Sequence, residues 1–343
     1  MHDVKGRIIV VSGASAGVGR ATALAFADAG AAWVVLLARE ADRLAAACAE
    51  VEQRGARALA IPTDVADAAA VERAAEQVER EIGPIAVWVN NAMATMFAPI
   101  EAITPGEFAR VTQVTYLGTV HGTMSALKRM RARNVGSIVQ VGSALAYRSI
   151  PLQSAYCGAK HAIRGFTDAV RCELIHDNSA VRICMAQLPG VNTPQFDWCR
   201  TSKRRHPQPV GAVYQPEVAA GAIVFAATHE RRELYVGAPS LLTIILNKAA
   251  PGLFDRLMAR RCYEQQFTDE AIAPDRPDNL FEPVPGPYGA HGSFDDRAHA
   301  RSPVLWGSEH RGLIGTALAL AGLSALVVAG ARSRGLLRGM RRY

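Results

Sequence analysis

Short apolar runs alternate with longer alanine-rich segments from the N-terminus to about residue 237. The runs are apolar throughout rather than at every second position, which is typical of strands buried on both faces. The segments between them have the periodicity of amphipathic helices, so a parallel sheet covered by helices on both faces is predicted. The predicted strands are Arg7–Val11, Trp33–Leu37, Arg57–Ile61, Ala86–Asn90, Ser137–Gly142, Val181–Ala186 and Glu233–Val236. The predicted helices include Glu40–Arg54, Ala66–Ile82, Pro105–Arg131 and Leu152–His176.

A glycine-rich turn, SGASAGVG over residues 12–19, follows the first predicted strand and precedes a helix predicted over Arg20–Ala29. Glycines allow the backbone of such a turn to approach a pyrophosphate, and the helix N-terminus adds partial positive charge. A tight turn without a ligand is the alternative. The position of the turn at the first strand-helix junction favours a dinucleotide site.

The end of the second predicted strand indicates which dinucleotide binds. A carboxylate there would bond the 2′-hydroxyl of the adenosine ribose and repel a 2′-phosphate. The chain instead has Ala38 and Arg39, and the planar fork of Arg39 suits a phosphate. NADP(H) is therefore predicted in preference to NAD(H). Arg39 as a solvated residue at a helix start, neutralised by Glu40, remains the alternative.

Tyr156 and Lys160 are four residues apart on a predicted helix and so share one face. A phenol with a pKa near 10 is a poor acid–base group at neutral pH, and a nearby ammonium would lower that pKa. Ser143, at the end of the fifth predicted strand, can donate to a carbonyl oxygen on which negative charge develops. These three residues are the predicted catalytic set.

With the glycine turn, Ser143 and the YCGAK motif in this order, the chain resembles the classical short-chain dehydrogenase/reductase family over about residues 5–237. The resemblance implies a Rossmann fold with a doubly wound seven-stranded parallel sheet, and a homo-dimer or homo-tetramer. It also implies that Tyr156 is the general acid–base, that Lys160 binds the nicotinamide ribose, and that Ser143 orients the substrate.

The resemblance further implies a full set of cofactor-binding residues. Asp64 is assigned to the adenine, although an N-cap of the following helix is an open alternative. Two positions depart from the family pattern. Met93 replaces a glycine after Asn90-Asn91-Ala92, and Thr115 replaces an asparagine that holds a water, which makes Thr115 a fourth candidate catalytic residue. The predicted cofactor-binding residues are Gly13, Ser15, Ala16, Gly17, Val18, Gly19, Arg39, Asp64, Val65, Asn91, Ala92, Tyr156, Lys160, Pro189, Gly190, Val191 and Thr193.

Four regions are predicted along the chain. Residues 1–240 form the NADP-binding catalytic domain, and residues 241–311 form an extension that is partly helical and then rich in proline and glycine. Residues 312–331 contain no charge and, as a helix, would cover about 30 Å, enough for a membrane-spanning or membrane-embedded helix. A buried apolar helix is the alternative. Residues 332–343 form a basic tail.

The charge distribution argues against nucleic-acid binding. The chain has a net charge of +7, but the last twelve residues carry five arginines and no acid, so the other 331 residues have only +2. Six scattered cysteines without a CxxC pair favour free thiols and no metal site. With no secretory signal, we expect a membrane-associated protein whose catalytic domain faces the cytoplasm.

These features predict an NADP(H)-dependent oxidoreductase that interconverts a ketone or aldehyde and an alcohol, on a lipophilic substrate. The alternative is a catalytically weakened, membrane-tethered NADP(H)-binding or scaffold protein, which the departures at Met93 and Thr115 motivate.

Overall fold

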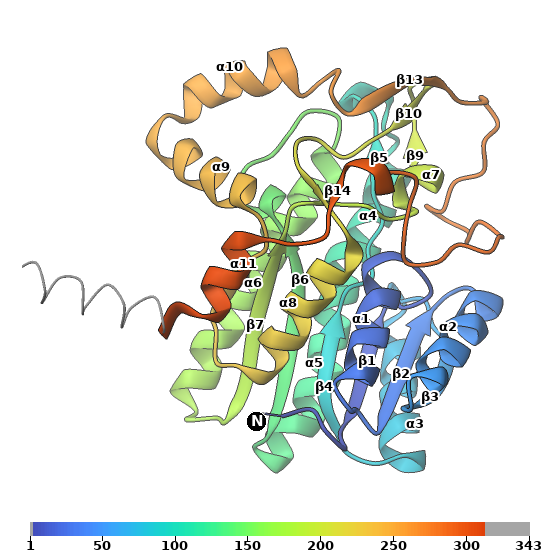
Figure 1. Ribbon diagram of the computed structural model, residues 1–343, viewed down its shortest axis with the longest axis vertical. Helices are drawn as coiled ribbons and strands as arrows, with labels where there is room; N and C mark the ends of the chain where they lie inside the picture. The colour runs from blue at the N-terminus through green and yellow to red at the C-terminus, as the bar shows by residue number, and fades with distance from the viewer. Residues whose placement is uncertain (1–2, 313–343) are drawn as a thin grey trace, which may run out of the picture.

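The computed structural model describes residues 3–312. Seven parallel strands form one sheet in the order β12-β7-β6-β4-β1-β2-β3 (Figure 1), which confirms the predicted doubly wound Rossmann fold. Each strand lies within two residues of its predicted limits. Their bounds are β1 Ile8–Ser12, β2 Trp33–Ala38, β3 Arg57–Pro62, β4 Ile85–Asn90, β6 Gly136–Ser143, β7 Val181–Leu188 and β12 Glu233–Tyr235.

Two helical layers cover the sheet, one on each face. One layer holds α1, α2 and α8, whose buried side chains form a core with one face of the strands. The other layer holds α3, α5 and α6 with a second core. Because both faces are covered, the strands read as continuous apolar runs. The helices are α1 Gly17–Asp28, α2 Ala41–Gln53, α3 Ala68–Glu81, α5 Gly118–Arg133, α6 Ser154–His176 and α8 Pro216–Thr228.

The segment predicted as one helix over Pro105–Arg131 is divided. It begins as α4 (Pro105–Thr112), whose N-terminus has a capping box between Thr104 and Glu107. A π-helical turn over Gln113–Leu117 separates α4 from α5. A π turn contains one residue more than an α turn, so it shifts the side chains that follow it around the helix axis.

After β12 the chain returns over the carboxyl ends of the strands (Figure 1). Helices α9 and α10 come first, and the strand β13 pairs with β10 of the loop after β7. Residues 273–294 have mostly irregular structure, and the short β14 then pairs with β11. The bounds are α9 Ala238–Ala249, α10 Pro251–Arg261, β13 Phe267–Ala271, β10 Arg205–Pro207, β14 Ala298–His299, β11 Val213–Tyr214 and α11 Pro303–Glu309.

Three further short elements complete this region. Strand β5 (Met96–Phe97) pairs with β9 (Arg200–Thr201), and the short helix α7 (Gln195–Trp198) precedes β9. Strand β8 (Gly190–Val191) pairs with β11. Among residues 3–312, no helix is long and apolar enough to cross a bilayer. The helix predicted over 312–331 and the basic tail lie outside the described residues, apart from Gly312.

Candidate active site

A cavity of about 450 Å³ lies along the carboxyl ends of the strands. It runs from Arg39 at the end of β2 to Tyr156 and Lys160 on α6. Almost every residue that the sequence predicted for the site lines it. Those residues are Gly13, Ser15, Ala16, Gly17, Val18, Arg39, Asp64, Val65, Asn91, Ala92, Ser143, Tyr156, Lys160, Pro189, Gly190, Val191 and Thr193. Gly19 and Thr115 are the two predicted residues that are absent from its lining.

The glycine turn between β1 and α1 is tightly packed against the loop after β4. Gly13 has a φ of +67°, and a Cβ at this position would lie 2.8 Å from the Cα of Ala92. A Cβ on Gly19 would collide with the carbonyl oxygen of Gly13, so Gly19 serves the packing of the turn rather than the cavity wall. The Asn91 side chain donates to the carbonyl of Ser12 at 2.9 Å. Asn91 therefore positions the turn.

Three polar side chains meet at the α6 end of the cavity. Ser143 lies close enough to the Tyr156 hydroxyl to affect its pKa, and the Ser143 Oγ accepts from the Leu145 amide at 3.1 Å. The Lys160 Nζ donates to the carbonyl of Val141 on β6 at 2.7 Å and lies 5.5 Å from the centroid of the Tyr156 ring. The geometry thus brings together the three residues predicted to be catalytic from their spacing.

The pKa values of Tyr156 and Lys160 differ from those expected from the sequence. Burial raises the pKa of Tyr156 above its ordinary value, although the nearby Ser143 side chain acts in the opposite direction. Burial also lowers the pKa of Lys160 to about 8, because an ammonium loses its hydration there. The predicted lowering of the Tyr156 pKa by Lys160 is not found, because the Lys160 ammonium is directed at the carbonyl of Val141.

Thr115 is fully buried in the π turn and lies away from the cavity wall. Its hydroxyl donates to the carbonyl of Ala94 at 2.8 Å and accepts from the Ala94 amide at 3.0 Å. The sequence placed Thr115 among the catalytic residues, and its geometry does not match this. Both hydrogen bonds instead support the loop that carries Ala92 and Met93, and the latter lines the cavity.

At the opposite end of the cavity, Arg39 donates to two main-chain carbonyls, those of Asn279 and Phe281, each at 2.6 Å. Glu40 does not neutralise it. The Glu40 carboxylate accepts from the amides of Asp42 at 3.1 Å and Arg43 at 2.7 Å and so caps α2. The guanidinium of Arg39 is therefore held in place by neutral partners.

Asp64 accepts from the Ala66 amide at 2.9 Å and from Arg110 of α4 at 2.5 Å. The N-cap of α3 is Asp67, so the alternative that Asp64 caps this helix is wrong. Burial opposes ionisation, but the hydrogen bonds from Arg110 and Ala66 lower the pKa of Asp64 below its ordinary value. Arg110 was not predicted, because a lone arginine on an amphipathic helix carries no sequence signal of its partner.

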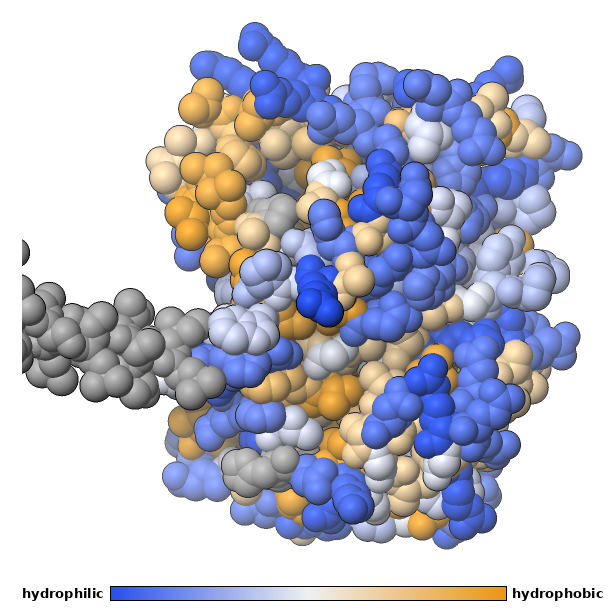
Figure 2. Space-filling view, in the orientation of Figure 1, coloured by the Kyte–Doolittle hydropathy of each residue, from blue (hydrophilic) through white to orange (hydrophobic). Residues whose placement is uncertain are grey.

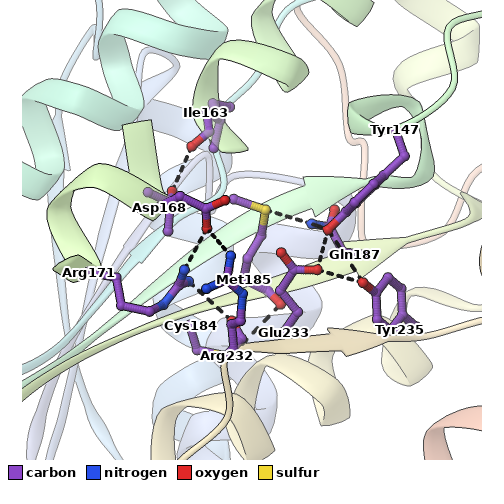
Figure 3. A network of polar contacts seen from close by, with 11 residues as sticks. Tyr147, Ile163, Asp168, Arg171, Cys184, Met185, Gln187, Arg232, Glu233 and Tyr235 are labelled. Carbon is purple, nitrogen blue, oxygen red and sulfur yellow. Dashed lines mark hydrogen bonds and ion pairs between the residues drawn. The ribbon is translucent and has the colours of Figure 1, made fainter. Parts of the chain in front are cut away.

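The loop after Ser143 is anchored by a polar network at the edge of the sheet (Figure 3). The Glu233 carboxylate on β12 accepts from the hydroxyls of Tyr147 and Tyr235, the latter at 2.7 Å. Burial raises the pKa of Tyr147, and the contact with Glu233 adds to this. Arg148, next in the chain, donates to Asp255 of α10 at 2.7 Å. The network therefore ties the Ser143 loop to the sheet and to the helices above it.

Helices α9 and α10 complete the cavity at the α6 end. They contribute Thr243 and Met258 to its lining, and Cys262, directly after α10, lines it as well. Phe196 of α7 lines it as well, whereas Trp198 of the same helix lies at the other end of the cavity, with its ring centroid 5.1 Å from the guanidinium carbon of Arg43. Arg205, in the loop after β7, pairs with Glu264 at 2.8 Å, in the segment that follows α10. This end of the cavity is thus largely apolar beside the Ser143 and Tyr156 hydroxyls.

The residues of the cavity fit a nicotinamide dinucleotide. Gly13 and Gly17 have positive φ values and let the turn pack against Ala92 and Thr193 while its backbone lines the cavity, and the wall includes Arg39, the glycine turn and Lys160. One donor of the turn is already used, because the Gly17 amide donates to the carbonyl of Gly289 at 3.0 Å.

Comparisons with known proteins agree with this geometry. A model of the short chain dehydrogenase family matches residues 7–203. The uncharacterized oxidoreductase YxnA of Bacillus subtilis is 30% identical over 331 residues, which cover 96% of this chain and 92% of that protein. A metagenomic short-chain oxidoreductase solved with NADP is 25% identical with a TM-score of 0.58, covering 68% of this chain and 97% of that one. A short-chain dehydrogenase/reductase from Burkholderia phymatum solved with NAD is 21% identical, and its TM-score of 0.67 over 80% of this chain and all of that one supports the fold.

Proposed function

The chain belongs to the short-chain dehydrogenase family, and on this premise we propose that it is an NADP(H)-dependent oxidoreductase that interconverts a ketone or aldehyde and an alcohol. The observation that carries this proposal is one continuous cavity. Its wall includes the Ser143, Tyr156 and Lys160 side chains at one end and Arg39 at the other.

The proposed roles of the side chains are those that membership of the family implies. When bound, the nicotinamide ring gives or takes the hydride. The Tyr156 hydroxyl gives a proton to the carbonyl oxygen in reduction and takes it back in oxidation. The Ser143 hydroxyl, beside that of Tyr156, donates to the same oxygen and holds it where negative charge develops. Lys160 binds the nicotinamide ribose through its ammonium and remains fixed to Val141.

Two features support NADP(H) over NAD(H). First, the residue directly after the last residue of β2, Ala38, is Arg39 and not a carboxylate that would repel a 2′-phosphate, and the Glu40 carboxylate that follows caps α2. Second, Arg39 and Arg43 both line this end of the cavity, and Arg110 reaches the same region from α4. The NADP bound to the 25% identical metagenomic enzyme is consistent with this choice.

A lipophilic substrate is supported by the apolar lining near Ser143, which includes Phe97, Leu145, Ile150 and Met258. Hydrophobic residues also gather on the outer face of α9 and at its junction with α10 (Figure 2). Leu242, Ile245 and Leu253 on this face are 57%, 55% and 69% exposed.

We assign this apolar face to a lipid bilayer. The same two helices carry exposed basic residues, Lys248 on α9 and Arg256, Arg260 and Arg261 on α10, and these suit anionic headgroups. The chain continues beyond Gly312 with an uncharged apolar sequence. Membrane attachment with the catalytic domain on the cytoplasmic side would let a lipophilic substrate enter beside α9.

Exposed apolar side chains on α4, the π turn and α5 support self-association. Phe108, Leu117 and Met124 are 37%, 37% and 63% exposed. A homo-dimer or homo-tetramer would cover them, and light scattering of the purified protein measures the oligomeric state.

NADPH oxidation with a panel of aliphatic and aromatic ketones tests the activity. Wild-type protein should turn over at least one lipophilic ketone, and Tyr156→Phe should lower kcat by about a hundredfold or more, because it removes the proton donor without changing the ring. Turnover that survives Tyr156→Phe would refute the mechanism. NADPH binding without turnover in the wild type would favour the scaffold alternative.

Flotation with anionic vesicles tests the membrane assignment. Full-length protein should float, whereas a chain ending at Arg311 should float less. The same truncated chain with Leu242→Gln and Leu253→Gln should lose its remaining binding. Equal partition of all three forms would contradict membrane association.

A further inference from the structure

Residues 279–289, here called the strap, cross the adenosine end of the cavity and belong to the C-terminal extension, beyond the part that matches the family model. Asn279 and Pro283 of the strap line the cavity itself. Five carbonyls of the strap accept hydrogen bonds from arginine side chains of the Rossmann domain. These pairs are Asn279 and Phe281 with Arg39, Leu280 with Arg110, Val284 with Arg43 and Tyr288 with Arg20.

The three carbonyls of Asn279, Leu280 and Phe281 are consecutive and are held by only two arginines. Arg39 takes the outer two at 2.6 Å each, and Arg110 takes the middle one at 3.1 Å. The Leu280 side chain between them is fully buried and belongs to the same core cluster as Val65 and Val111. Since the chain is fixed at Leu280, the two carbonyls that hold Arg39 are fixed as well.

Neutral carbonyls orient a guanidinium without cancelling its charge. Arg110 has a carboxylate partner in Asp64, and Glu40 is used in capping α2. Burial lowers the pKa of Arg39, and the nearby Arg110 adds to this, while Asp64 and Glu282 act in the opposite direction. Arg39 is therefore an oriented cation at the cavity wall, and among residues 3–312 no acidic side chain contacts it directly. An anionic group of a ligand could pair with this charge.

We propose that the strap is a wall of the dinucleotide site and that, through the anchor Leu280, it positions Arg39 to receive the 2′-phosphate of NADP(H). Leu280 is thus a positioning residue that acts through Arg39, while Asn279 and Pro283 face the ligand directly. The inference rests on the proposed preference for NADP(H). It assigns a binding role to a segment whose sequence has no periodicity or motif.

Calorimetric titration of the ligand-free protein with NADPH and with NADH tests the proposal. Wild type should bind NADPH more tightly, and Arg39→Ala should remove the difference. Leu280→Ala should weaken NADPH binding by about tenfold, the equivalent of one lost charge-assisted contact, and change NADH binding by less than about twofold. Leu234→Ala is the matched control. It removes an equally buried leucine from β12, at the opposite edge of the sheet.

If Arg39→Ala abolishes the preference and Leu280→Ala keeps it, the proposal is overturned while the cofactor assignment stands. A wild type that binds both dinucleotides equally overturns both. Should Leu280→Ala fail to fold, Leu280→Val removes less volume and should weaken NADPH binding in the same direction. Hydrogen exchange on the wild type gives an independent readout. Amides of 279–284 should exchange more slowly with NADPH than with NADH, and equal protection by both would also overturn the proposal.

Discussion

The buried ammonium of Lys160 gives a stability prediction with a defined pH window. Burial lowers its pKa to about 8, whereas an unfolded lysine has a pKa of about 10.4. Between these values the unfolded chain binds a proton that the folded chain does not. The free energy of unfolding therefore rises with pH from about 8 to about 10.4. Below pH 8 the charged, buried Lys160 costs the native state about 3 kcal/mol, since each pKa unit corresponds to about 1.4 kcal/mol.

Lys160→Met removes the titrating group and keeps an unbranched side chain of similar length. The other groups that titrate at alkaline pH are common to both proteins, so the difference between the two unfolding free energies isolates Lys160. Wild type should gain about 3 kcal/mol relative to Lys160→Met when the pH is raised from 7 to about 10.4. The lost hydrogen bond to Val141 shifts the variant by an amount that is the same at every pH.

Urea unfolding of the ligand-free proteins at intervals of one pH unit measures this difference. Lys128→Met removes an exposed lysine of α5 and serves as the matched control. A wild-type to Lys160→Met difference that stays constant within about 0.5 kcal/mol over the whole range would refute the reasoning, because the ammonium would then be as well solvated in the folded chain as in the unfolded one.

Three further predictions concern the supports of the site. Thr115→Val should destabilise the protein by about 2 kcal/mol, because both Ala94 main-chain groups lose their partner, while kcat of the folded enzyme changes little; a collapse of kcat at full stability would instead indicate a proton relay. Glu233→Gln should loosen the Ser143 loop and lower kcat several-fold, and unchanged kinetics would argue against this support. Gly122→Ala places a Cβ 2.5 Å from the Trp88 indole nitrogen, so soluble yield and Tm should fall sharply, and a wild-type Tm would show that this packing relaxes.

The sequence by itself determined the sheet, its helical layers and which three residues are proposed to be catalytic. Strands covered by helices on both faces are apolar throughout, so the seven strands of the main sheet can be recognised as apolar runs in the sequence. Tyr156 and Lys160 are related by one helical turn, and Ser143 ends a neighbouring strand, so local periodicity and strand order bring the three together. The glycine turn is visible for a similar reason, because its close packing against Ala92 requires residues without a Cβ.

Only the tertiary structure decided what Thr115, Arg39 and the C-terminal extension contact. The π turn directs the Thr115 hydroxyl at the main chain of Ala94, and a helical pattern in the sequence does not reveal the extra residue in the turn. Arg39 binds carbonyls some 240 positions away. Every residue has a main-chain carbonyl, so these acceptors cannot be recognised from the amino-acid sequence. Only the tertiary structure, in which the strap crosses the cavity, places them beside Arg39.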